Sequence, residues 1–211
     1  MFRLKEIIVI LISSLLIAFP YFLSKNLSFI LSFVFALIVL FVYFLTEKIA
    51  AYYFETASEI KFWEEKRYGF YEKSYFKFGV PYGVILSFIL PLISSGYFKW
   101  FALTQTELKE KKSRVARKHF FYSYPKLTEW NISLICGIPI ISLFFLSIII
   151  KVISNFFPIL TILPKISCYF ALFNLLPIGN LNGMKILAGS FKFWLFLVCL
   201  TFFSLAFVIL L

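Results

Sequence analysis

The chain alternates long apolar runs with short polar stretches along its whole length. Apolar runs of about 20 residues match the hydrocarbon thickness of a bilayer when they form helices. The pattern therefore predicts an all-α membrane protein, built as a multi-pass helical bundle of five or six transmembrane segments. The six apolar runs are residues 7–22, 27–45, 78–96, 132–150, 156–177 and 191–211.

The run of residues 78–96 differs from the others because glycine and proline interrupt it. A helix broken at membrane depth frees backbone groups, which must then be buried in protein or face water. This composition suits a segment that enters the membrane and returns to the same side. The interrupting residues are Gly79, Pro81, Gly83, Pro91 and Gly96.

Positive charge helps to choose between a crossing segment and a re-entrant one. Two polar stretches, residues 46–77 and 99–130, carry most of the Lys and Arg residues. Six full crossings would place these stretches on opposite sides, against the preference of Lys and Arg for the cytoplasmic side. We therefore favour five crossings plus a re-entrant segment at residues 78–96, with six crossings as the alternative. The basic residues left on the outer side are then Lys25, Lys151 and Lys165.

One integral membrane domain accounts for the whole chain. The predicted location is the cell membrane, with the basic loops on the cytoplasmic side. The parts of this domain are a helical hairpin (1–45), an interfacial and cytoplasmic region (46–130) that contains the apolar segment 78–96, and C-terminal helices (131–211) with a broken-helix motif at 174–183.

Composition supports a membrane protein and narrows its partners. Hydrophobic residues make up 62% of the chain, whereas roughly half is usual in a soluble domain. The net charge is +11, but the basic residues flank apolar runs and do not cover a polar face. We therefore expect anionic lipid headgroups as partners, and no nucleic acid. The three cysteines stand singly inside apolar runs and are interpreted as packing residues.

Residues 174–183, Asn-Leu-Leu-Pro-Ile-Gly-Asn-Leu-Asn-Gly, interrupt a helix in the most informative part of the chain. This stretch resembles the second signature of the site-2 protease family of intramembrane zinc metalloproteases, which runs Asn-x-x-Pro-x-x-x-x-Asp-Gly. Asn174, Pro177 and Gly183 fall on that signature, and Asn182 stands at the position of its aspartate. The alternative interpretation is an ordinary loop between two membrane segments.

Weaker similarities extend the resemblance over residues 44–194. The first signature of the family is His-Glu-x-x-His at a helix end, and its best-placed counterpart is Thr46-Glu47-Lys48-Ile49-Ala50. The stretch from Glu59 to Trp63 resembles the Glu-aromatic-basic-x-Trp sequence that follows that signature. Segments that resemble the approach to the middle core helix of the family are residues 114–117 and 127–130, before an apolar run with Gly137 and Pro139.

The resemblance implies a zinc site whose ligands are missing from this chain. In the family, two histidines spaced i and i+4 on one helix face and a distant aspartate bind Zn²⁺, and the glutamate is the general base. Thr46, Ala50 and Asn182 stand at the ligand-equivalent positions, so we expect no bound zinc. Glu47 is the vestigial member of the catalytic set, and the only histidine, His119, lies in the basic loop.

The resemblance therefore implies a protein of the site-2 protease type without catalysis, which binds a transmembrane helix or a partner membrane protein. We expect Glu47, Asn182 and Lys185 to form a hydrogen-bonded cluster, because ionisable groups at membrane depth need partners. The alternative is that both charged side chains extend to the interface. Two other functions stay open, an active zinc intramembrane protease with atypical ligands and a small transporter or membrane scaffold. The predicted cleft and motif residues are Asn174, Pro177, Asn182, Gly183 and Lys185.

Overall fold

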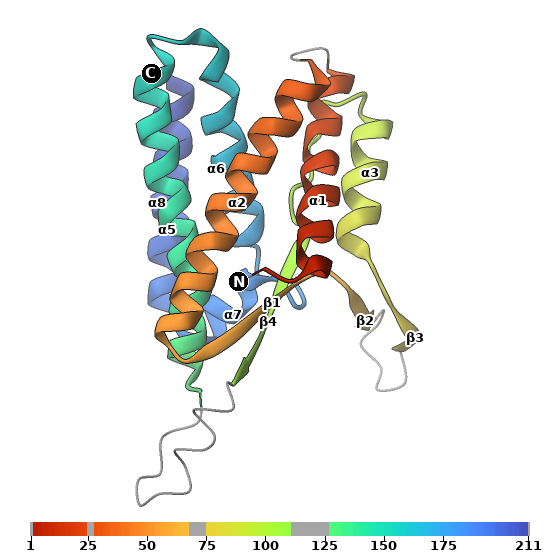
Figure 1. Cartoon of the computed structure of the whole chain (residues 1–211), viewed down its shortest axis with the longest axis vertical. Helices are drawn as coiled ribbons and strands as arrows, with labels where there is room; N and C mark the ends of the chain where they lie inside the picture. Colours follow the sequence, from red (N-terminus) through yellow and green to blue (C-terminus); the bar gives the residue numbers. More distant parts are fainter. Residues whose placement is uncertain (1, 25–27, 68–74, 111–126, 211) are drawn as a thin grey trace, which may run out of the picture.

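The computed structural model of the chain is a bundle of long helices with short strands gathered at one end (Figure 1). α1 (Leu4–Leu23) and α2 (Phe29–Tyr53) form a hairpin. α5 (Glu129–Ser154) packs against α2 and against α8 (Phe191–Leu210). The residues described are 2–24, 28–67, 75–110 and 127–210.

Within these described residues, four helices are long and apolar enough to cross a membrane, namely α1, α2, α5 and α8. A helix rises about 1.5 Å per residue, so about 20 residues cover the hydrocarbon core of a bilayer. Two shorter apolar segments are α3 (Tyr82–Ile93) and the joined pair of η1 (Pro158–Thr161) and α6 (Ile162–Asn174). The chain is thus a mainly helical protein with four candidate membrane-spanning helices. The count of five or six transmembrane segments stays a prediction.

α5 holds the C-terminal half of the bundle together, because it contacts α2, α6, α8 and α7 (Asn182–Gly189). It begins after Thr128, whose hydroxyl accepts a hydrogen bond from the Asn131 N–H at 3.3 Å and so caps the helix. Between α2 and α6 the core is aromatic. The fully buried ring of Tyr43 meets those of Phe44 and Phe170 edge-on, each at 5.1 Å between centroids.

The prediction of an all-α protein is wrong for the polar stretches, because the described residues contain two antiparallel strand pairs. The pairs are β1 (Thr56–Phe62) with β4 (Thr104–Glu110), and β2 (Glu65–Arg67) with β3 (Tyr75–Val80). In β1 the buried positions alternate, at Thr56, Ser58 and Ile60, as in a strand with one face on the core. Thr and Ser give that alternation little hydrophobic contrast, so it is weak in the sequence.

Residues 78–96 leave the strand end of the bundle, and the chain then comes back to that end (Figure 1). α3 begins beside the returning chain, because a Cβ on Gly83 would stand 2.6 Å from the carbonyl oxygen of Leu103. It ends beside α1, where a Cβ on Gly96 would stand 2.8 Å from the Ser24 nitrogen. Its 12 residues extend only about 18 Å. This path has the geometry expected of a re-entrant segment.

Lys99 lies at the opposite end of the bundle from the one that the sequence predicts. Its Nζ stands 4.2 Å from the ring centroid of Tyr21, near the C-terminal end of α1. The reason is the re-entrant path, since Lys99 is at the far end of the limb that leads from α3 back to β4. The basic residues at positions 111–118 of the same stretch lie outside the described residues.

α2 continues to Tyr53, past the predicted end of the hairpin at residue 45. Polar residues do not end the helix there, because each has a partner on a neighbouring element. Thr46 contacts Ser142 of α5 at 3.1 Å between hydroxyl oxygens, and Lys48 donates to Glu6 of α1 at 2.6 Å. The last two turns of α2 therefore carry polar side chains into the structure.

Candidate functional site

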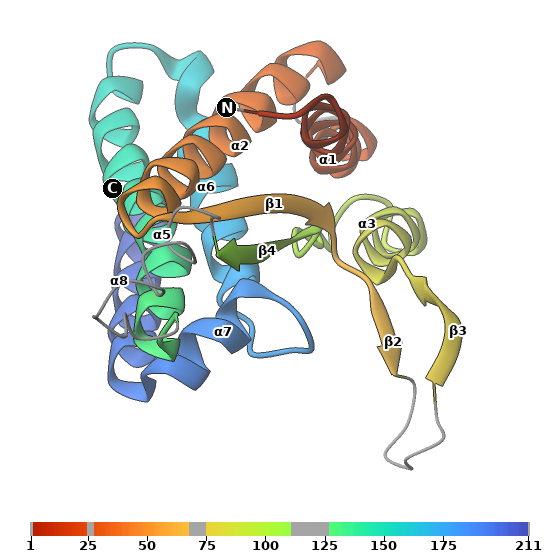
Figure 2. The ribbon, with the colours of Figure 1, turned by 60° about the horizontal axis from the view of Figure 1, so that its bottom comes forward.

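The site begins with Glu47, a fully buried carboxylate on α2. Its Oε2 accepts a hydrogen bond from the hydroxyl of Thr106 at 2.8 Å. Thr106 belongs to β4 and is itself fully buried. Pairing with β1 positions β4 across the end of the bundle, beside α2 and α7 (Figure 2). An otherwise solitary acidic side chain thus meets a strand that crosses beneath the helices.

Asn182, the first residue of α7, reaches the same hydroxyl from the other side. Its Nδ2 donates to Thr106 Oγ1 at 3.2 Å and to the hydroxyl of Tyr43 at 2.9 Å. Its Oδ1 accepts from the backbone N–H of Thr106 at 3.3 Å. Buried amides need such partners, because an unpaired polar group costs about 1–3 kcal/mol. The amide is therefore locked between α2 and β4.

Lys185 completes the cluster one turn further along α7. Its Nζ donates to the backbone carbonyl of Thr106 and contributes positive charge beside Glu47. The structure thus brings together Glu47, Asn182 and Lys185, the three residues expected to meet. Thr106 joins all of them and was not among the predicted residues. Its signal in the sequence is faint, a Thr-Gln-Thr strand directly after the apolar residues 101–103.

Thr46 and Ala50 lie on a different side of α2 from the one that the signature alignment implies. Thr46 faces Ser142 of α5, and Ala50 packs against Ile135, also on α5. Residues i and i+4 share a helix face. The pair that faces Asn182 is therefore Tyr43 and Glu47. The assignment of Thr46 and Ala50 as ligand-equivalent positions is wrong in this geometry, because the face turned toward Asn182 starts three residues earlier.

The residues of the cluster do not fit a zinc ion. Structural and catalytic zinc sites use Cys, His, Asp or Glu, whereas Glu47 is joined here by a phenol, a hydroxyl, an amide and the ammonium of Lys185. That ammonium occupies the neighbourhood with positive charge, which opposes a second cation. No group of three or more His, Cys, Asp or Glu side chains gathers among the described residues, which do not include His119. Comparison of the chain with protein families, with curated proteins and with solved structures finds no match.

The broken-helix motif forms the turn between α6 and α7. Asn174 is fully buried and its Nδ2 donates to the carbonyl of Phe170 at 2.9 Å, while Pro177 is exposed. These two residues therefore shape the turn and do not join the cluster. Gly183 is packed against the turn itself, because a Cβ there would stand 2.3 Å from the carbonyl oxygen of Leu175. The close approach of this backbone requires glycine.

Glu65 of β2 fastens the tip of the same turn. Its Oε1 accepts from the Asn180 N–H at 2.6 Å and from the indole of Trp63 at 3.1 Å. Gly179 has a φ of +52°, and a Cβ on it would stand only 1.7 Å from the Glu65 carboxylate. The second strand pair is thereby tied to the motif, which the sequence does not predict.

A cavity of about 400 Å³ borders the cluster. It lies between β4, the start of α5 and α7, and both Thr106 and Lys185 line it. Apolar surface comes from Leu108 and Ile132, and polar surface from Asn180. A neighbouring cavity of about 370 Å³ on the side of β2 shares Gln105, Glu107 and Asn180 with it.

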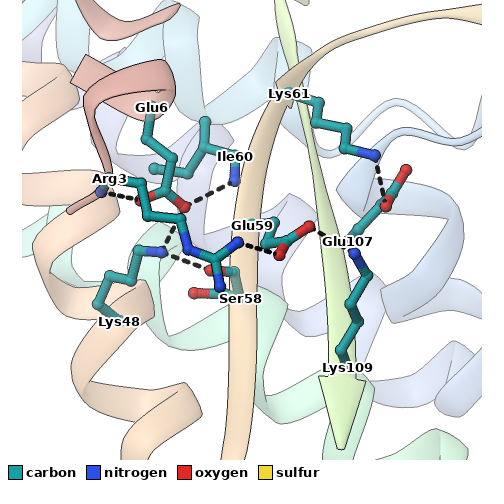
Figure 3. A network of polar contacts seen from close by, with 9 residues as sticks. All are labelled: Arg3, Glu6, Lys48, Ser58, Glu59, Ile60, Lys61, Glu107 and Lys109. Atoms are coloured by element: carbon teal, nitrogen blue, oxygen red, sulfur yellow. Dashed lines mark hydrogen bonds and ion pairs between the residues drawn. The ribbon is translucent and has the colours of Figure 1, made fainter. Parts of the chain in front are cut away.

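A polar network at the same end fixes β1 and β4 to the helices (Figure 3). Glu6 of α1 is 3% exposed, and it accepts hydrogen bonds from the backbone N–H of Arg3 at 2.8 Å, from Lys48 at 2.6 Å and from the Ile60 N–H at 3.2 Å. Lys48 also donates to the carbonyl of Ser58. One carboxylate thus joins α1, α2 and β1.

The outer part of this network pairs charges across the two strands (Figure 3). Glu59 lies between Lys109 and Arg3, each at 2.6 Å, and the hydrogen bond from Lys109 chiefly holds the pKa of Glu59 below its ordinary value. Lys61 pairs with Glu107 at 2.7 Å, and this bond raises the pKa of Lys61. These exposed pairs each stabilise the fold by less than about 1 kcal/mol, so they set the register of β1 on β4 more than the stability.

Proposed function

We propose that this chain is a multi-pass membrane protein of the site-2 protease type that does not catalyse proteolysis, and that it binds a transmembrane helix or another membrane protein. The observation that carries the proposal is the buried cluster of Glu47, Thr106, Asn182 and Lys185. It joins two separate segments, residues 43–47 and 182–185, at the positions where the resemblance implies a metal centre.

The first support is chemical. Zinc-dependent hydrolysis needs a metal-bound water and a glutamate that is free to accept its proton. In this chain one oxygen of Glu47 already accepts from Thr106, and Lys185 supplies the nearby positive charge. A carboxylate and an ammonium held by neutral hydrogen-bond partners form a complete structural cluster, which argues against the alternative of an active protease with atypical ligands.

The second support is the cavity beside the cluster. Its volume of about 400 Å³ is in the range of ligand sites, and it is lined by one strand and two helices. Leu108 and Ile132 offer apolar surface to side chains of a partner helix, while Lys185 and Asn180 offer polar contacts. The basic side chains at this end, including Arg3 and Lys109, suit the anionic headgroups of the cytoplasmic leaflet of the cell membrane.

Site-specific photo-crosslinking in the native membrane tests this proposal. A photoreactive amino acid replaces Leu108 or Ile132 in the cavity, and a matched control replaces Phe202, which is 56% exposed on α8. We expect the two cavity positions to give an adduct with the same membrane protein, with the crosslinked peptide inside one of its transmembrane segments. Adducts with lipid only, or equal protein adducts at Phe202, would contradict the proposal.

A further inference from the structure

The end of the bundle opposite the cluster carries lysines without acidic side chains. This end is formed by the C-terminal part of α1, the chain after α3 and the start of α6 (Figure 1). No Glu or Asp occurs in residues 7–46, 73–106 or 130–211, which contain all of these segments. Lys99 and Lys165 are both half-buried here. Carboxylates of the same segments therefore cannot neutralise them.

Aromatic contacts bring Lys99 and Lys165 toward each other. Lys99 lies over the ring of Tyr21, whose centroid stands 6.3 Å from that of Phe101. Phe101 in turn meets Tyr169 edge-on at 6.2 Å. Tyr169 and Lys165 are one turn apart on α6, so they share a helix face. That face is turned toward the segment that holds Lys99.

The electrostatics agree with this convergence. Burial is the main cause that lowers the pKa of Lys99, and the positive charge of Lys165 lowers it further. The hydroxyl of Tyr21 is buried, at 2% exposure of the residue, and has no hydrogen-bond partner among the described residues. A buried hydroxyl without a partner is costly. The three groups are all hydrogen-bond donors, and what they lack is a shared acceptor with negative charge.

We propose that Lys99, Lys165 and the hydroxyl of Tyr21 bind a phosphate group, either from a lipid headgroup or as a free phosphate anion. Phosphate supplies several acceptor oxygens to the two ammonium groups and the phenol at once. The site lies near the C-terminal end of the membrane-spanning candidate α1, where lipid headgroups are expected. It is separate from the cluster at the strand end, and it does not depend on the proposed function.

Lipid binding to the purified full chain tests the site. The protein in an uncharged detergent is titrated with phosphatidylglycerol, and native mass spectrometry counts the lipid molecules that remain bound. We expect one tight site in the wild type. Lys99→Gln and Lys165→Gln should each weaken it about fivefold or more, because one lysine near a membrane surface contributes on the order of 1 kcal/mol.

Lys151→Gln is the matched control, since it removes one charge from a lysine that the sequence places on the same outer side. It should change the affinity less than twofold, and Lys99→Arg and Lys165→Arg should keep the tight site because they keep the charge. Displacement of the lipid by millimolar inorganic phosphate would assign the site to the free anion. Persistence of the lipid would assign it to the headgroup. Equal effects of all three Gln substitutions, or the absence of one tight site, would overturn the proposal.

Discussion

Thr106 is the residue on which the buried cluster depends. Its hydroxyl donates to Glu47 and accepts from Asn182, while its N–H donates to the Asn182 side chain and its carbonyl accepts from Lys185. Two helices that are far apart in the sequence therefore meet at one strand residue. Because every partner is buried or half-buried, no water can replace a lost contact at low cost.

Replacing Thr106 by Val removes the hydroxyl and keeps the shape of the side chain. The Glu47 carboxylate and one Asn182 N–H then lose a partner in the interior, which should lower the free energy of unfolding by about 1–3 kcal/mol for each group. Thermal unfolding in detergent, followed by tryptophan fluorescence, measures the change. Thr106→Ser keeps the hydroxyl and loses one methyl, so it should cost only about 1 kcal/mol. Equal destabilisation by both variants would argue against a hydrogen-bonded hub.

Much of this site could be predicted from the sequence, but its centre could not. Glu47 and Lys185 are conspicuous because ionisable residues are rare beside long apolar runs, and Asn182 stands out in the broken-helix motif. Which sector of α2 faces α7 depends on how the helices pack, so the sequence could not separate Thr46 from Tyr43. Thr106 resembles many exposed threonines until the pairing of its strand is known.

Strands support the motif at the scale of elements. β4 supplies Thr106, β1 ties β4 to α1 and α2, and β2 supplies Glu65 to the turn between α6 and α7. The long helices could be predicted, since their apolar runs match the membrane. The strands could not, because their buried positions are mostly Thr and Ser, and the pairing of β1 with β4 joins residues far apart in the chain.

Replacing Glu65 by Ala should release the motif turn without disturbing the bundle. The Asn180 N–H donates to this carboxylate, and a hydrogen bond to a charged group contributes about 1.5–3 kcal/mol. Hydrogen–deuterium exchange should therefore speed up at least about tenfold for the peptide that contains residues 178–181. Glu64→Ala removes the same charge from the neighbouring position and is the control. A similar increase in both variants would mean that the turn responds to charge alone.

The whole molecule has two unlike ends. The strand end carries the buried cluster and paired charges of both signs, whereas the opposite end carries Lys99 and Lys165 in segments without acidic side chains. The difference follows from the path of the chain, which enters along α3 and returns to β4. That path was predicted from positive charge and from glycine and proline in residues 78–96, but the position of Lys99 on the returning limb was not.

Labelling of single cysteines from one side of sealed vesicles tests the path. Cys136, Cys168 and Cys199 are first replaced by Ala, and cysteine is then introduced at Lys61, Lys109 or Tyr97. An impermeant thiol reagent should modify Lys61→Cys and Lys109→Cys from the same side, because β1 and β4 are paired. Tyr97→Cys should react from the other side. Reaction at positions 61 and 109 from opposite sides would favour six crossings.

The metal content of the purified full chain tests most directly whether the cluster of Glu47, Thr106, Asn182 and Lys185 stands in place of a zinc centre. The protein is purified without chelators, loaded with zinc and washed, and zinc per chain is measured by elemental mass spectrometry. We expect far less than one zinc per chain, with the same low value in Glu47→Gln, because Lys185 and neutral partners complete the cluster. One zinc per chain in the wild type, lost in Glu47→Gln and in Asn182→Ala, would contradict this.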